Sequence, residues 1–275
     1  PSGGSNVGTR GLFMGGLKNQ QPSPSTTNEI DYINIASQGD SQDFGDLTTN
    51  MYSLAMGQMA STTRGFNGGG APNPGLDTIN SVLFSSTGSA VDFGNMDVRR
   101  YTHSMHSNAT RGLFMGGYVH PSYNNSIGYI TMATEGDALD FGDMTASTGY
   151  GCGGGNSTRA FHFGGANNES TIQKLQIGTL GNAEEFGDLS QGITAAPGSV
   201  TNSTRTIHCC GQLAPSPNAI TRSCYLYLSV SGGTTTFFGE LTASRSYGSM
   251  GVSSEVRGVL AGGYTPTQLN TIDYI

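Results

Sequence analysis

The sequence predicts an all-β fold built from six similar units of short antiparallel strands. The first observation is a repeat, because the octapeptide TRGLFMGG occurs at 9–16 and again at 110–117. The second is composition: 43 glycines, no tryptophan and only 11% charged residues favour short strands and turns over helices. Since a repeat of this kind implies one continuous array or ring, we treat residues 1–275 as a single domain.

Two markers define the period of the repeat. Looser copies of the octapeptide place an arginine at intervals of 54, 47, 48, 46 and 52 residues. A second marker falls between the arginines, and its copies are DFGDL (43–47), DFGNM (92–96), DFGDM (140–144), EFGDL (185–189) and FFGEL (237–241). The anchoring arginines are Arg10, Arg64, Arg111, Arg159, Arg205 and Arg257.

Each unit contains four strand signals, as the third unit illustrates. A segment of small residues precedes Arg111, an apolar run ends in Gly116–Gly117, an alternating run follows at 127–134, and a short aromatic run covers 138–145. Glycine lies at or near each reversal between the third and fourth signals, which predicts tight hairpins. Because strands crowd most at the centre of a radial array, we expect the small-residue segment to be the innermost strand.

This pattern resembles the kelch repeat of β-propellers, in which a double glycine ends the second strand and a tyrosine lies in the third. The matching glycine pairs are 15–16, 116–117, 164–165 and 262–263, and the matching tyrosines are Tyr32, Tyr129, Tyr225 and Tyr274. The tryptophan of the fourth kelch strand is missing, so this is a distant variety. Phenylalanine replaces it, as Phe44, Phe93, Phe141, Phe186 and Phe238.

The strand count is uneven. Six inner strands, six glycine-pair strands and six tyrosine-type strands are expected, but only five of the DFGDL type. The simplest interpretation is a β-propeller of six kelch-like four-stranded blades, of which the last is incomplete. A missing C-terminal continuation and a final strand donated by another chain are the alternatives.

A closer resemblance is to repeats of the form TRGLFxGG…TIDYITIAS…DFGDLT in kelch-like virion structural proteins of marine bacteriophages. IDYINIAS (30–37) and TIDYI (271–275) carry it. It implies a non-enzymatic component of the capsid surface, tail or tail fibre, located in the virion in several copies, with other virion proteins and host-surface glycans as partners. A cellular kelch-type protein-interaction scaffold is the second hypothesis, and a glycan-acting propeller enzyme is the third.

Charge and hydropathy exclude other partners. A net charge of −7 and only two lysines argue against nucleic acid. No apolar run reaches 18 residues, so no membrane insertion is expected, and the first residues do not have the pattern of a signal peptide. The four cysteines, Cys152, Cys209, Cys210 and Cys224, are expected to be buried free thiols, with a disulfide or a metal as the alternative.

The repeated arginine is the most regular charged position. We expect it to be a structural clamp that bonds carbonyls, or a carboxylate of the recurring Asp46, Asp143, Asp188 and Glu240, where two blades meet. The alternative is a ring of cations around an anion channel. Five copies of DFG in register indicate architecture rather than a kinase metal site.

The segments after the double glycine vary most in length, and such loops emerge on one face of a propeller. Their content of Tyr, Asn, Gln and Pro suits contact with carbohydrate or protein, and the candidate binding residues are Tyr118, His120, Tyr123, Asn124 and Tyr264. The alternative is that these loops are only solvated. No catalytic set, cofactor or metal is expected: His103 and His106 should face opposite ways, and calcium at Asp137 and Asp140 is a minor alternative.

Overall fold

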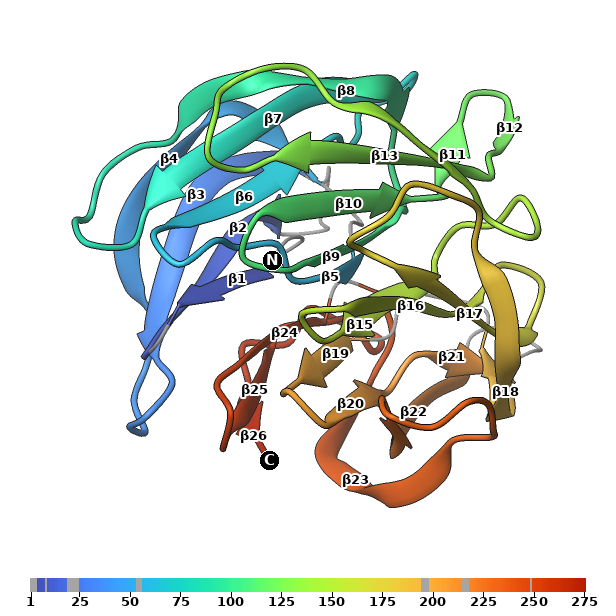
Figure 1. The fold of residues 1–275 in the computed structure, drawn as a ribbon. Coiled ribbons are helices and arrows are strands. Elements are labelled where there is room, and N and C mark those ends of the chain that lie inside the picture. Colours follow the sequence, from blue (N-terminus) through green and yellow to red (C-terminus); the bar gives the residue numbers. More distant parts are fainter. Residues whose placement is uncertain are drawn as a thin grey trace.

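The described part of the chain folds into strands joined by turns and loops, so the all-β fold that the sequence predicts is confirmed. The computed structural model describes residues 4–7, 9–18, 25–52, 56–193, 198–213, 218–247 and 249–275, and this part of the chain contains no helix (Figure 1). Its main sheets follow one another in chain order and are called sheets 1 to 6 below.

Sheets 1, 3, 4 and 5 each join four successive long strands by antiparallel pairing. Sheet 1 contains β1 (Gly4–Val7), β2 (Arg10–Lys18), β3 (Ser25–Asn34) and β4 (Gln42–Met51). Sheet 3 contains β9 (Ser104–Ser107), β10 (Arg111–Met115), β13 (Ser126–Thr131) and β14 (Leu139–Asp143). Sheet 4 contains β15 (Cys152–Gly155), β16 (Arg159–Gly165), β17 (Glu169–Gln176) and β18 (Glu184–Ile193). Sheet 5 contains β19 (Gly198–Thr201), β20 (Arg205–Cys209), β22 (Asn218–Tyr227) and β23 (Thr236–Arg245), with β21 (Gln212–Leu213) also paired to β22.

Sheets 2 and 6 have three antiparallel strands each. Sheet 2 contains β6 (Arg64–Gly68), β7 (Leu76–Leu83) and β8 (Val91–Arg100), and sheet 6 contains β24 (Met250–Ser253), β25 (Gly258–Ala261) and β26 (Ile272–Tyr274). A separate hairpin of β11 (Tyr118–Val119) and β12 (Ser122–Tyr123) rises from the loop between β10 and β13.

The second inner strand differs from the prediction. An antiparallel strand was expected before Arg64; residues 53–55 of that segment lie outside the described residues, and the described strand, β5 (Met56–Gly57), pairs in parallel with β9 of sheet 3. This segment passes through the centre of the molecule, where it lies beside β15, β19 and β24 as well. A Cβ built on Gly57 would lie 1.9 Å from the Met105 carbonyl oxygen, so the two main chains touch. After β5 this segment returns to sheet 2, where the Phe66 amide of β6 donates to Met59 O at 3.1 Å.

The remaining inner strands lie side by side around β5. β9 contacts β15, β15 contacts β19, β19 contacts β24, and β24 contacts β1. Small residues permit this crowding, because a Cβ on Gly153 or Gly251 would lie 2.1 or 1.9 Å from a neighbouring carbonyl oxygen.

The apolar core lies between consecutive sheets rather than in one central layer. In sheets 1 to 4 the phenylalanine of the fourth strand shares a cluster with the residue that directly follows the third strand of the next sheet: Phe44 with Phe84, Phe93 with Met132, Phe141 with Ile177, and Phe186 with Leu228. These four phenylalanines are 3–5% exposed. Each of these four junctions therefore buries a large apolar side chain that neither sheet could bury alone.

Candidate binding site

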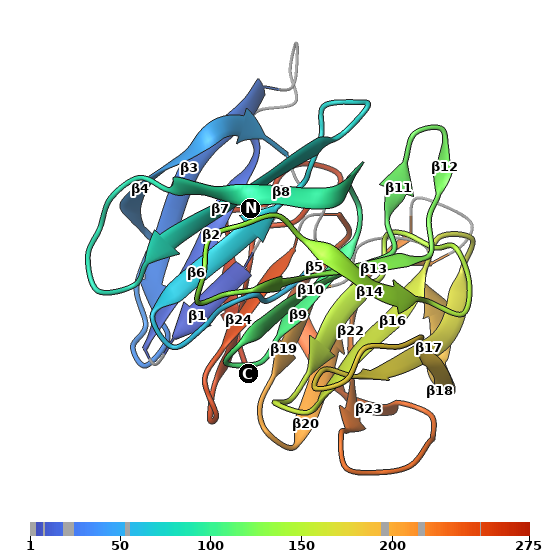
Figure 2. The same ribbon diagram turned by 45° about the horizontal axis from the view of Figure 1, so that its top comes forward.

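The β11–β12 hairpin places two tyrosines opposite each other. Tyr118 and Tyr123 are cross-strand partners, and their ring centroids lie 5.5 Å apart at 83°. The Tyr118 hydroxyl donates to Pro121 O at 2.9 Å, and this bond closes the turn. The hairpin projects from the rest of the fold, at the upper right of Figure 2.

Further aromatic rings extend this pair across neighbouring sheets. The centroid of Tyr101 lies 5.2 Å from that of Tyr118, Tyr150 lies 6.3 Å from Tyr123, and Tyr247 lies 6.2 Å from Tyr150. The exposed His120 ring lies 6.3 Å from Tyr118. We call this set, Tyr101, Tyr118, Tyr123, Tyr150, Tyr247 and His120, the tyrosine cluster.

Unusual main-chain conformations hold three of the loops that carry the cluster. Thr102, Tyr150 and Tyr247 have φ angles of 58°, 63° and 21°, a region that side chains other than glycine seldom adopt. Each lies in the loop before an inner strand, of sheets 3, 4 and 6 respectively. The Tyr150 amide donates to Thr102 O at 2.8 Å, which joins two of these loops. Non-glycine residues in this region are frequent at binding sites, where the surrounding contacts compensate for the strain.

Burial disfavours ionisation of three phenols of the cluster. Burial raises the pKa of Tyr150 to about 12 and also raises the pKa values of Tyr101 and Tyr123. Near Tyr150, the Thr148 hydroxyl donates to Glu169 at 2.9 Å, and burial raises the pKa of this half-buried carboxyl group. The region thus offers ring faces, phenol donors and a carboxylate acceptor, which together suit the C–H faces and hydroxyls of a sugar or the side chains of a protein.

The structure brings together three of the five predicted binding residues. Tyr118, His120 and Tyr123 belong to the tyrosine cluster, whereas Asn124 supports their hairpin: its amide donates to Gly117 O at 2.9 Å and its side-chain oxygen accepts from the Ser126 amide. Tyr264 lies outside the ring contacts, with its main chain paired to Ser246.

The sequence analysis missed Tyr101, Tyr150 and Tyr247. The available signal was positional, because a tyrosine precedes the inner strand at Tyr52, Tyr101, Tyr150 and Tyr247.

A hollow of about 680 Å³ is the other candidate site, and it lies where the turns between the first and second strands of several sheets meet. Its asparagines already bond from sheet to sheet: the side-chain amides of Asn108, Asn156 and Asn202 donate to Ser157 O, Ser203 O and Glu255 O. Because these polar groups hold the turns in place, this hollow is a weaker candidate than the tyrosine cluster.

Four of the six repeated arginines donate to a carbonyl of another sheet. The bonds are Arg10 to Phe84 O (2.7 Å), Arg111 to Ile177 O (2.9 Å), Arg159 to Leu228 O (2.8 Å) and Arg257 to Ile35 O (3.1 Å). Nη1 of Arg64 is buried without a partner, and Arg205 lies over the rings of Tyr225 and Tyr227. Within the described ranges none of the six forms an ion pair, so Asp46, Asp143, Asp188 and Glu240 are not their partners here.

The remaining candidates, the four cysteines and the two aspartates Asp137 and Asp140, are buried or hydrogen-bonded within the fold. The four cysteines are free and buried, as expected. Asp137 accepts from the Asn95 main-chain amide of β8 at 2.8 Å, a bond between sheets 3 and 2, and Asp140 accepts from the Gly142 amide two residues along its own strand at 3.1 Å. In the part of the chain that the structure covers, no three His, Cys, Asp or Glu side chains gather as a metal site would require.

No family model matches this chain, and no curated protein matches it. Over the described residues there is no helix of the length and hydropathy needed to span a membrane.

Proposed function

We propose that the chain is a non-enzymatic binding module: a six-bladed β-propeller whose tyrosine cluster contacts host-surface glycans, carried by a virion as a structural component of its capsid surface, tail or tail fibre. The observation that carries the binding role is the continuous run of rings from the loops of three sheets. The virion role rests on the resemblance of the repeat to phage proteins.

The propeller arrangement is supported by contacts between the last and first sheets. The Arg257 guanidinium of sheet 6 donates to Ile35 O of sheet 1, as Arg111 of sheet 3 donates to sheet 4. The Gln38 side-chain amide also donates to the Tyr274 hydroxyl at 3.2 Å. Limited proteolysis followed by mass spectrometry tests this: a closed ring keeps sheet 6 intact, and rapid trimming back to about Val256 would contradict closure.

Binding can be tested on an array of bacterial surface polysaccharides. We expect Tyr123→Ala and Tyr150→Ala to weaken binding about tenfold or more, because each removes a ring from the middle of the cluster. Tyr227→Ala is the matched control, since Tyr227 is 48% exposed on β22 and does not belong to the cluster. Equal losses in all three variants, or no glycan bound by the unaltered chain, would contradict a glycan site.

The virion role needs a separate measurement. Immunogold electron microscopy of purified phage particles, with antibody against this chain, should label one repeated position on the particle. Unlabelled particles from cells whose lysate contains the protein would favour a cellular interaction scaffold instead.

A further inference from the structure

One repeated arginine, Arg64 of sheet 2, has none of the contacts that the other five make. Four of those donate to a carbonyl of another sheet, and Arg205 lies over the rings of Tyr225 and Tyr227. Nη1 of Arg64 is buried without a partner, and no described residue joins its guanidinium by a hydrogen bond, an ion pair or a ring contact. Because a desolvated guanidinium nitrogen without an acceptor is unfavourable, an added acceptor would stabilise this place.

The third strand of sheet 2 explains why Arg64 is uncovered. In four other sheets a tyrosine of the third strand covers the repeated arginine, with the guanidinium carbon 5.0–5.8 Å from the ring centroid. In sheet 2 the residue at this place is Ser81, two positions before the cross-strand partner of Arg64. In sheet 3 the same place belongs to Tyr129. Since serine has no ring, the side of the guanidinium that a tyrosine would cover stays open.

A hollow of about 160 Å³ lies beside Arg64. Three serines line it together with the arginine: Ser81 of β7, and Ser86 and Ser89 of the hairpin between β7 and β8. The rest of the lining is aliphatic side chains and a glycine, so the hollow has one cation and no carboxylate. A guanidinium and hydroxyl groups are donors that suit the oxygen atoms of an anion.

The hairpin of sheet 2 also differs in charge from its counterparts. Ser89 follows the hairpin glycine, and its hydroxyl accepts from the Asp46 main-chain amide of sheet 1 at 3.3 Å. In sheet 3 the equivalent residue is Asp137, whose carboxylate accepts from the Asn95 amide at 2.8 Å. In sheet 1 it is Asp40. Ser89 therefore makes the bond between sheets without a negative charge that would repel an anion from the hollow.

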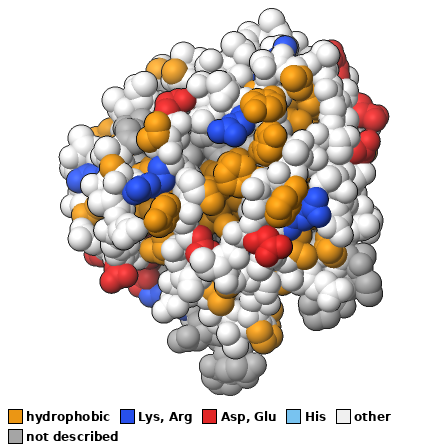
Figure 3. Space-filling view, turned by 90° about the horizontal axis from the view of Figure 1, so that it is seen from below, with side chains coloured by type: hydrophobic (Ala, Val, Ile, Leu, Met, Phe, Trp, Pro, Cys, Tyr) orange, Lys and Arg blue, Asp and Glu red, His pale blue; other side chains and the backbone are white. Residues whose placement is uncertain are grey.

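The surrounding surface does not supply a broad attraction for anions. On the face drawn in Figure 3, lysine and arginine side chains lie apart from one another, among acidic and apolar ones. The chain also has a net charge of −7. An anion therefore needs a place where an arginine and neutral donors meet without a carboxylate, as they do at Arg64.

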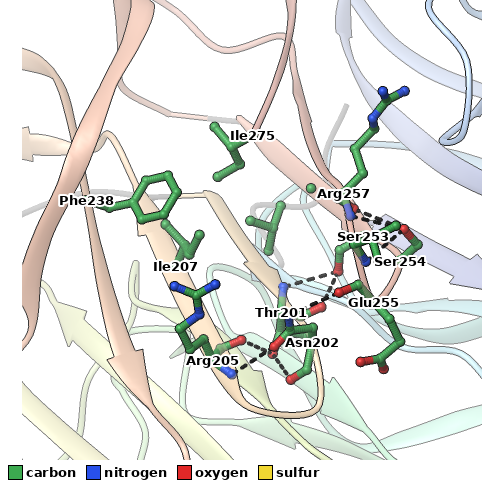
Figure 4. A pocket seen from close by; sticks show the side chains of 13 residues that line it. Thr201, Asn202, Arg205, Ile207, Phe238, Ser253, Ser254, Glu255, Arg257 and Ile275 are labelled. Atoms are coloured by element: carbon green, nitrogen blue, oxygen red, sulfur yellow. Dashed lines mark hydrogen bonds between the residues drawn. The ribbon is translucent and has the colours of Figure 1, made fainter.

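The hollow beside Arg205 has a different chemistry. It measures about 310 Å³ and lies between sheets 5 and 6. Figure 4 shows the apolar side chains of Phe238 and Ile207 close together in it, and the carboxylate of Glu255 belongs to its lining as well. Because this hollow combines an apolar wall with a carboxylate, and tyrosine rings cover its arginine, it suits an anion poorly.

We propose that the hollow between Arg64 and the β7–β8 hairpin is a binding site for a phosphate group. The guanidinium supplies the positive charge and donates to phosphate oxygens, and the hydroxyls of Ser81, Ser86 and Ser89 donate to the others. A tetrahedral phosphate has enough acceptors for this set of donors, whereas a carboxylate has only two oxygens. The phosphate is either the free ion or a substituent of a sugar, and the site does not depend on the tyrosine cluster.

Calorimetric titration of the full chain with inorganic phosphate, at pH 7.5 and physiological ionic strength, tests this site. We expect saturable binding to one site per chain. Arg64→Gln should weaken binding about tenfold or more, because it removes the positive charge. Ser89→Asp should weaken binding by about as much, because its carboxylate repels phosphate. The fold should tolerate this aspartate, since Asp137 makes the same bond between sheets at the equivalent position.

Asn182→Asp is the matched control for charge. Asn182 has the position of Ser89 in the hairpin of sheet 4, and its side-chain oxygen accepts from the Asp143 amide at 2.9 Å. The variant makes the same change of charge at an equivalent place, and it should keep the phosphate affinity within about twofold because salt screens distant charges. Equal thermal midpoints of Ser89→Asp and the unaltered chain without phosphate would show that the loss of binding is not a loss of folding.

The proposal is overturned if phosphate does not bind saturably, if Arg64→Gln binds it as tightly as the unaltered chain, or if Ser89→Asp and Asn182→Asp weaken binding equally. Glucose 1-phosphate distinguishes the two sources of the group. Tighter binding of this probe than of inorganic phosphate would assign a phosphorylated sugar, and equal binding would assign the free ion. Failure of glycan binding at the tyrosine cluster would leave these results unaffected.

Discussion

The junction between sheets 4 and 5 and the junction between sheets 5 and 6 are built from the same repeat positions but end in different states. Phe186 is 5% exposed beneath the hairpin of sheet 5, whereas Phe238 is 42% exposed. Arg159 reaches two carbonyls, at 2.8 and 3.0 Å, whereas Arg205 reaches only aromatic rings. The difference shows that a fourth strand is half of an interface, and that its phenylalanine, glycine and arginine partner act only when the next hairpin is present.

The largest expected effect is a loss of stability in acid. The two junctions should therefore be compared at pH 7.5, where this loss does not occur. Burial lowers the pKa of His103 to about 3 and those of His106, His162 and His208 to about 4, below the ordinary 6.5. Between pH 6.5 and 4 the unfolded chain therefore binds more protons than the folded chain. The contribution of these histidines to stability is fully present above pH 6.5 and is lost as the pH falls through this window. Each histidine contributes about 1.4 kcal/mol per pH unit.

Denaturant titrations at pH 7.5 and 5.0 measure this change. We expect a loss of several kcal/mol in the free energy of unfolding, and a smaller loss in His208→Gln than in the unaltered chain. An unfolding free energy that is the same at both pH values would show that these histidines are not buried as neutral groups.

The next effect comes from the two phenylalanines. Phe186→Ala should cost about 3–5 kcal/mol, because it leaves a cavity against Leu228, and Phe238→Ala should cost less than about 1 kcal/mol. Denaturation at pH 7.5 compares them directly. Equal costs would mean that the edge of sheet 5 is closed in solution.

The glycines of the two junctions give a smaller contrast. A Cβ on Gly187 would lie 2.0 Å from Gly233 O, so Gly187→Ala should cost about 1–3 kcal/mol through displacement of the hairpin. Gly239→Ala should change stability by no more than about 0.5 kcal/mol. Thermal midpoints measured on both variants test this, and a large loss in Gly239→Ala would place an unseen neighbour against β23.

The sequence predicted the parts of the fold that repeat. The double glycine is one, because its first position has a φ of 62–64° at Gly15, Gly116 and Gly164 and favours a residue without Cβ. The parallel pairing of β5 could not be predicted, since a periodic pattern does not say which unit passes through the centre. Cys210 also departs from the pattern, with a φ of 57° at the position of the first glycine.

Two fully buried arginines were also beyond prediction, because they lie outside the repeated arginine position. Arg100 bonds Asp97 at 2.6 Å and Gly116 O at 2.9 Å, and Arg245 bonds Asp273 and Gly262 O. They join sheets 2 to 3 and 5 to 6, the junctions at which Arg64 and Arg205 make no carbonyl bond.

The tyrosine cluster was only half predicted for a related reason. Its members come from loops that are distant in the sequence, and the pattern of a single repeat unit does not show which loops of different units lie close together.

The smallest effect separates Arg159 from Arg205 and decides whether the arginine acts as a clamp. Arg159→Ala should cost about 1–2 kcal/mol, because it removes two charge-assisted bonds to sheet 5 at a half-buried site, whereas Arg205→Ala loses only ring contacts and should cost about 0.5 kcal/mol or less. Arg159→Lys is the control for charge: a lysine cannot reproduce the planar fork, so it should recover little of the loss. Chemical denaturation of these variants at pH 7.5 gives the answer. A clamp predicts that Arg159→Ala costs clearly more than Arg205→Ala. Equal costs for the two variants would show that the carbonyl bonds of Arg159 add little to the junction.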